Sequence, residues 1–162
     1  MRLLIHDRPP AFDRQMQAKF DRVIFADGHY APCQGCFQCW TKTPASCKMK
    51  DRLQEISRVI GQAEDIILVT ENCYGGFSPA VKNILDRSIA SSTPMSTYRG
   101  GQMHHTLRYG HQRRWSVYVY GDTSPAERRT WALLVERNAI NEGFPSYDLS
   151  FIEDLKDLED LA

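Results

Sequence analysis

Five short segments of the chain have the apolar pattern of buried β-strands. The central one, Ile66-Ile67-Leu68-Val69, is apolar throughout, as expected for a parallel strand that helices cover on both faces. Residues 115–120 are rich in aromatic and β-branched side chains, which favour strands. The predicted strands cover residues 2–5, 22–26, 66–69, 115–120 and 147–152.

Amphipathic segments separate these strands and predict helices. Ser78-Pro79 and Ser124-Pro125-Ala126-Glu127 each place a capping hydroxyl before a proline at the first helical position, and the second also forms a capping box. Asp51 is the expected N-cap of the segment that follows it. The predicted helices cover residues 11–20, 51–63, 79–89 and 125–142, with at most a short helix at 155–161.

Alternation of strands and helices predicts an α/β fold with a parallel sheet and right-handed crossovers. Five strands suit a flavodoxin-like three-layer sandwich with strand order 2-1-3-4-5, in a single domain over residues 1–162. Ligands of such sheets bind at the carboxyl ends of strands 1 and 3, so the loops 6–11, 70–78 and 120–124 should meet there. Two long excursions, 29–50 and 91–113, show no convincing periodicity.

Composition narrows the class of protein. The 162 residues are 42% hydrophobic and 25% charged, which is typical of a globular protein and excludes a disordered one. Twenty basic side chains balance twenty acidic ones, so a dedicated nucleic-acid or anionic-membrane surface is not expected. No apolar run approaches the ~20 residues of a membrane span, and the first residues do not have the pattern of a signal peptide. We therefore expect a cytoplasmic protein with small-molecule partners.

Four of the five cysteines lie within the first excursion, with the spacing C-x2-C-x2-C-x7-C. Thiolates at three-residue intervals can surround a compact cluster, as in ferredoxin-type sites. Four thiolates can also hold zinc, and a third alternative is a set of free or redox-active thiols that line a pocket. The candidate metal ligands are Cys33, Cys36, Cys39 and Cys47.

The loop after the third strand is the candidate ligand loop. Its two glycines allow the backbone to come close to a flat ring, and its aromatic side chains can stack on that ring. Backbone amides at the start of the next helix point toward the same space. The candidate binding residues are Asn72, Cys73, Tyr74, Gly75, Gly76, Phe77 and Ser78, together with Gly121 and Asp122 on the neighbouring loop.

These motifs together resemble the flavodoxin-like NAD(P)H-dependent FMN reductases and the iron–sulfur flavoproteins. The matching residues are Cys33-x-Gly-Cys36-x-x-Cys39-Trp40, Thr43-Pro44, Cys47, Lys50-Asp51, Tyr74-Gly75-Gly76-Phe77-Ser78, Lys82, Leu85-Asp86-Arg87, Met103-His104-His105 and Arg108-Tyr109. The resemblance implies bound FMN, a homo-oligomer (dimer or tetramer), and electron transfer between NAD(P)H or ferredoxin and a small acceptor. In the iron–sulfur members, four cysteines at similar spacing ligate a [4Fe–4S] cluster.

The loop after the first strand departs from the family pattern, in which Ser, Gly, Asn and Thr cradle the FMN phosphate. Here Pro9 and Pro10 have no N–H to donate, and Asp7 would repel a phosphate, which leaves Arg8 as a candidate cation. We therefore expect poor discrimination between FMN and riboflavin. The alternative function is that of a degenerate flavodoxin-like protein without flavin, acting as an interaction or assembly subunit.

Overall fold

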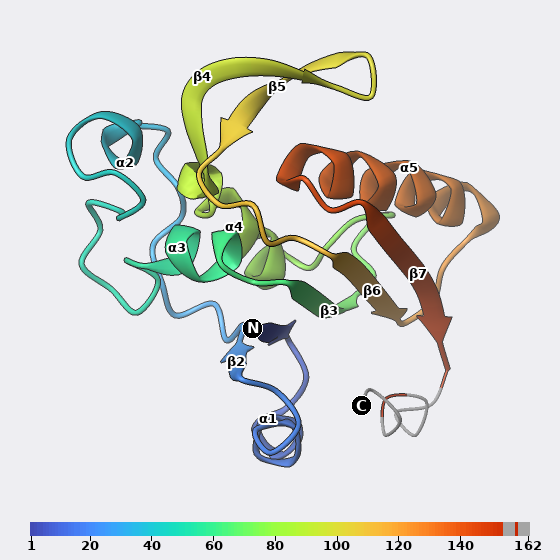
Figure 1. Ribbon diagram of the computed structural model, residues 1–162. Helices are drawn as coiled ribbons and strands as arrows, with labels where there is room; N and C mark the ends of the chain where they lie inside the picture. Colours follow the sequence, from blue (N-terminus) through green and yellow to red (C-terminus); the bar gives the residue numbers. More distant parts are fainter. Residues whose placement is uncertain (154–157, 159–162) are drawn as a thin grey trace.

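A computed structural model describes residues 1–153 and 158 of the chain (Figure 1). Five parallel strands form the main sheet in the order β2-β1-β3-β6-β7, which confirms the predicted flavodoxin-like order. The strands are β1 (Arg2–His6), β2 (Arg22–Phe25), β3 (Asp65–Glu71), β6 (Arg114–Tyr120) and β7 (Ser146–Ile152).

Helices cover both faces of this sheet and give the predicted three layers. Helix α1 lies on one face, whereas α3, α4 and α5 lie on the other (Figure 1). The helices are α1 (Pro10–Met16), α2 (Gln38–Thr41), α3 (Ile56–Gly61), α4 (Pro79–Asp86) and α5 (Pro125–Glu142), with a 3-10 turn η1 (Ile89–Ser91). No helix in the described part of the chain is long and apolar enough to cross a membrane.

Alternate side chains of the strands pack into two apolar cores, one on each side of the sheet. Leu3 and Ile5 of β1 point into the larger core with α3, α4 and α5, whereas Leu4 points into the smaller core with Met16 of α1. Leu158 also packs into the smaller core, and the rest of the predicted last helix lies outside the described residues. The two cores fix the sheet between its helices and hold its carboxyl edge in place.

Local chemistry explains where the helices begin. The Ser78 hydroxyl accepts from the Val81 N–H at 3.3 Å, and Ser124 forms the predicted capping box with Glu127. The expected cap at Asp51 is wrong: α3 begins at Ile56, because the Asp51 carboxylate instead accepts from Leu53 N–H in a local turn and pairs with Arg87. Helices α1 and α4 also end earlier than predicted, at Met16 and Asp86.

The second excursion was predicted to be irregular, but most of it forms a two-stranded antiparallel hairpin. Strands β4 (Ser92–Arg99) and β5 (Gln102–Leu107) are joined by Gly100-Gly101, both at positive φ, a conformation that suits tight hairpin turns. Arg99 donates to the carbonyl oxygens of Ile140 and Asn141, so the hairpin is fastened to the C-terminal end of α5. The first excursion, 29–50, is irregular as predicted except for the single turn of α2.

Candidate functional site

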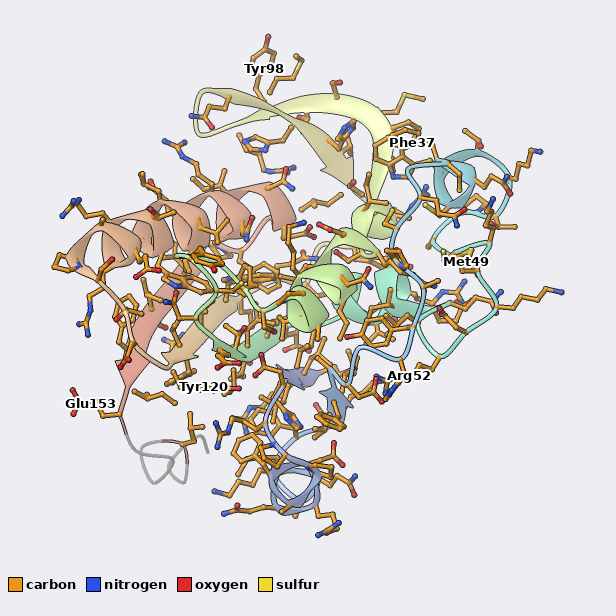
Figure 2. All side chains as sticks on the ribbon, turned by 180° about the vertical axis from the view of Figure 1, so that it is seen from behind. Phe37, Met49, Arg52, Tyr98, Tyr120 and Glu153 are labelled. Carbon is orange, nitrogen blue, oxygen red and sulfur yellow. The ribbon has the colours of Figure 1, made fainter. Side chains whose placement is uncertain are left out.

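Three loops meet at the carboxyl edge of the sheet, as predicted from the strand order. The Asn72 N–H donates to the Tyr120 carbonyl at 2.8 Å, which joins the loop after β3 to the end of β6. The Asp7 side chain, after β1, contacts both of these strands. In Figure 2 Tyr120 marks this edge, on the opposite side of the molecule from Tyr98 near the tip of the hairpin.

Asn72 is the centre of the loop after β3. Its side-chain oxygen accepts from the indole N–H of Trp131 at 2.8 Å and from the Gly75 N–H at 3.1 Å. Its amide nitrogen donates to the Asp122 carbonyl at 2.7 Å and lies 3.4 Å from the Glu127 carboxylate. One side chain therefore fastens loop 72–78 to helix α5 and to the loop after β6.

Residues 74–77 place one aromatic ring outside and one inside. Tyr74 is 94% exposed and has a left-handed backbone, whereas Phe77 is buried edge-on against Trp131 with ring centroids 4.9 Å apart. Of the predicted aromatic pair, Tyr74 alone presents its ring to solvent. Gly75 has φ +82°, and a Cβ there would lie 3.2 Å from the Glu127 Cα, so its close approach is to α5. At Gly76 a Cβ would meet nothing nearer than 3.6 Å.

The loop after β6 supplies backbone rather than side-chain contacts. Gly121 has φ +86° and is exposed, and Asp122 is exposed with its carbonyl bound to Asn72. Both predicted residues therefore lie beside loop 72–78. Loop 72–78 also borders a cavity of about 620 Å³ between α4 and α5, through Cys73, Gly76 and Phe77.

The loop after β1 does not fit a phosphate group. The Asp7 carboxylate accepts hydrogen bonds from the Thr70 hydroxyl, the Glu71 N–H and the Tyr120 hydroxyl. Burial, and then the negative charge of Asp7, raise the pKa of Tyr120, so its hydroxyl stays protonated and donates. The Arg8 guanidinium lies over the Tyr120 ring, 4.4 Å from its centroid. An anion of the protein itself already occupies this edge.

The four candidate cysteines line one small cavity. Cys33 and Cys36 are exposed, Cys47 is half-buried and Cys39 is buried. Burial raises the pKa of the Cys39 thiol, and the neighbouring Cys47 adds to the shift. Within residues 1–153 and 158, no group of three or more His, Cys, Asp or Glu is arranged to hold a single metal ion.

Arg87 lines the same cavity and was missed as a site residue, although it ends the motif that follows the ligand loop. Its side chain is fully buried. One guanidinium nitrogen bonds to Asp51 and to the Ala31 carbonyl, whereas Nε and Nη2 have no hydrogen-bond partner among the described residues. Buried unpaired donors beside four thiols fit an anionic cluster, in which each cysteine binds a different iron.

Comparison with known proteins agrees with this architecture. Over 117 residues the chain is 27% identical to an iron–sulfur flavoprotein of Methanocaldococcus jannaschii, a match that covers 64% of this chain and 60% of that protein. A crystal structure of an FMN-dependent NADH-azoreductase from Bacillus anthracis in complex with FMN superposes with a TM-score of 0.58 at 13% identity, over 97% of this chain and 91% of that one. An NAD(P)H:quinone oxidoreductase from Methanothermobacter marburgensis superposes with a TM-score of 0.55 at 9% identity, over 96% and 87% of the two chains.

The two structural likenesses, at such low identity, concern the fold alone. Residues 11–107, more than half of the chain, match the model of the NADPH-dependent FMN reductase family. This match covers the cysteine loop, the ligand loop and the hairpin, whereas the loops after β1 and β6 lie outside it. The chain therefore belongs to the NADPH-dependent FMN reductase family.

Proposed function

We propose that this protein is a flavin-dependent oxidoreductase that moves electrons from NAD(P)H or ferredoxin to a small acceptor. The observation that carries the proposal is loop 72–78, whose backbone is fastened by Asn72 while the Tyr74 ring stays exposed. Membership of the FMN reductase family supports a flavin as the ligand. A bound flavin supplies the hydride and single-electron chemistry, whereas the protein supplies orientation and environment.

Different residues of the site are proposed to bind the flavin ring and the acceptor. Tyr74 offers a ring for stacking, and the backbone at Gly76 leaves room for a flat ligand. The cavity between α4 and α5 touches Cys73 and Gly76, so an acceptor held there would lie next to the ligand loop. Its walls combine apolar Leu85, Trp115 and Leu134 with a few polar side chains, which suits a small organic acceptor.

The cysteine cavity is proposed to hold a [4Fe–4S] cluster through Cys33, Cys36, Cys39 and Cys47. A cluster would supply one-electron transfer, and the free donors of Arg87 would face its negative charge. Anaerobic reconstitution should give about four irons per chain, the stoichiometry of a four-cysteine cluster, and Cys36→Ser should lose most of them. Bound zinc without iron would establish the zinc alternative, and neither metal would establish free thiols.

A homo-oligomer in the cytoplasm and a single domain over 1–162 remain predictions. Three exposed apolar side chains on the hairpin, Met95, Tyr98 and Met103, support contact with a second copy of the chain. Tyr98 faces Met103 across the hairpin, so the two form one patch. Sedimentation of the protein and of Tyr98→Lys checks this prediction, because a charge in such a contact should shift the protein toward the monomer.

A second candidate function is favoured by one observation. Asp7 already uses three donors at the carboxyl edge of the sheet, so these three donors need no ligand. A flavin-free interaction subunit would need no more than this. The visible spectrum of the purified protein, followed by addition of riboflavin, separates the two functions, since only an oxidoreductase site should take up the yellow ligand.

Gly76→Val tests the location of the ring. The variant should fold, because the nearest atom to a Cβ there is 3.6 Å away, but its side chain would extend toward Leu134, into the space where the flavin ring on the ligand loop is proposed to meet the acceptor in the α4–α5 cavity. We expect flavin affinity to fall by about tenfold or more, equivalent to about 1.4 kcal/mol. Gly110→Val is the matched control, since a Cβ at Gly110 meets nothing within 4 Å. Unchanged flavin affinity in a folded Gly76→Val protein would remove loop 72–78 from the site.

A further inference from the structure

We infer that this chain recognises a flavin by its ring and not by its 5′-phosphate, because the Asp7 carboxylate occupies the anion position at the end of β1. This inference rests on the proposed flavin function and names the ligand class that the site accepts. Riboflavin and other flavins without a phosphate should bind as well as FMN does.

The first argument is the use of the donors at this edge. Asp7 Oδ2 accepts from the Glu71 N–H at 3.0 Å and from the Thr70 hydroxyl at 3.3 Å. Its other oxygen, Oδ1, accepts from the Tyr120 hydroxyl at 2.9 Å. These donors belong to β3 and β6, which continue the sheet beyond β1, so they converge on the space outside the end of β1. To bind the same donors, a phosphate would have to displace the Asp7 carboxylate, which the chain itself holds beside them.

The second argument is the shortage of donors in the loop after β1 itself. Pro9 and Pro10 have no N–H. The Asp7 N–H donates to the Val69 carbonyl, and the Phe12 N–H donates to the Pro9 carbonyl. Helix α1 is only seven residues long, and its first residue, Pro10, contributes no N–H to the helix N-terminus. Of the six residues from 7 to 12, two therefore have no backbone N–H, and two have an N–H that already donates within the chain.

The third argument is charge. A phosphate at this edge would lie beside the Asp7 carboxylate, and like charges at close range repel. Arg8 is the neighbouring cation, and its buried Nε has no hydrogen-bond partner among the residues that the structure describes. Its guanidinium, however, lies against the Tyr120 ring that Asp7 holds in place. The Arg8 guanidinium is thus held against the ring whose hydroxyl binds the Asp7 carboxylate, and a phosphate that approached Arg8 would also approach Asp7.

Titration of the flavin-free protein with FMN and with riboflavin, followed by flavin fluorescence, tests the inference. We expect the two dissociation constants to agree within about threefold, equivalent to less than about 0.7 kcal/mol. Asp7→Asn removes the charge, so FMN should then bind at least about tenfold more tightly, whereas riboflavin binding should not change. Asp13→Asn, which removes an equal charge on nearby α1 without freeing the three donors, is the matched control and should leave both constants unchanged.

The outcomes separate this inference from the proposed function. If native protein binds FMN about a hundredfold more tightly than riboflavin, a phosphate site exists and the inference is wrong, although the flavin function stands. If neither flavin binds, the flavin function itself is refuted. The comparison of the two ligands on the native chain needs no variant, so misfolding of Asp7→Asn would not prevent the test.

Discussion

Replacement of Asn72 by alanine should loosen the ligand loop and destabilise the whole protein. Trp131 is fully buried, and its indole N–H donates to the Asn72 oxygen at 2.8 Å. A buried donor that loses its partner costs about 1–3 kcal/mol. The bonds to the Gly75 N–H and the Asp122 carbonyl lie at a wetter edge, where water replaces part of their contribution, so together they add about 1 kcal/mol. We therefore expect Asn72→Ala to lower the free energy of unfolding by about 2–4 kcal/mol.

A double-mutant cycle isolates the contribution of the indole N–H. Denaturant unfolding is measured for the native protein, Asn72→Ala, Trp131→Phe and the double variant. Trp131→Phe removes the donor, so Asn72→Ala should cost about 1–2 kcal/mol less in that background than in the native protein. If Asn72→Ala changed the free energy of unfolding by less than about 0.5 kcal/mol, or if the two substitutions were additive, the loop would not depend on this bond.

Three further predictions concern stability. Gly75→Ala should cost about 1 kcal/mol or more in denaturant unfolding, because Gly75 has positive φ and packs on α5, whereas Gly76→Ala should be nearly neutral. Burial lowers the pKa of His6 below its ordinary 6.5. As the pH falls below about 6.5, the unfolded chain therefore binds a proton at His6 before the folded chain does, and the free energy of unfolding at pH 7.5 should exceed that at pH 5.5. The substitution His6→Gln should reduce this difference. Arg87→Met should cost about 3 kcal/mol by leaving its acidic partner unpaired, whereas Lys82→Met, which breaks an exposed pair, should cost less than about 0.5 kcal/mol; equal losses would contradict this reasoning.

The sequence predicts those parts of the fold that depend on neighbours along the chain. Short segments rich in apolar, aromatic or β-branched residues locate the five strands. The caps Ser78 and Ser124 locate the starts of α4 and α5, because a cap acts over three residues. The hairpin was missed because its outward residues mix polar and apolar types. The pair Gly100-Gly101 was the available signal, since adjacent glycines at positive φ suit a two-residue hairpin turn.

The contacts that define the site join distant parts of the sequence and could not be predicted from local patterns. The cysteine spacing and the two glycines of the ligand loop are visible as motifs. By contrast, Asp7 meets Tyr120 across 113 positions of the chain, and Asn72 meets Trp131 across 59. The composition of the first loop suggested repulsion of a phosphate, but the partners of the Asp7 carboxylate emerge only when β1, β3 and β6 lie side by side.

The internal carboxylate at the end of β1 also bears on how the protein survives without its ligand. A protein that depends on a bound cofactor to pair its edge donors is stabilised only when the ligand concentration exceeds the dissociation constant, and the gain grows with the logarithm of that concentration. Here the Thr70, Glu71 and Tyr120 donors are paired within the chain itself. The protein without flavin therefore keeps these hydrogen bonds at any flavin concentration. The contribution of this edge to its stability in the cell does not depend on how much cofactor is available.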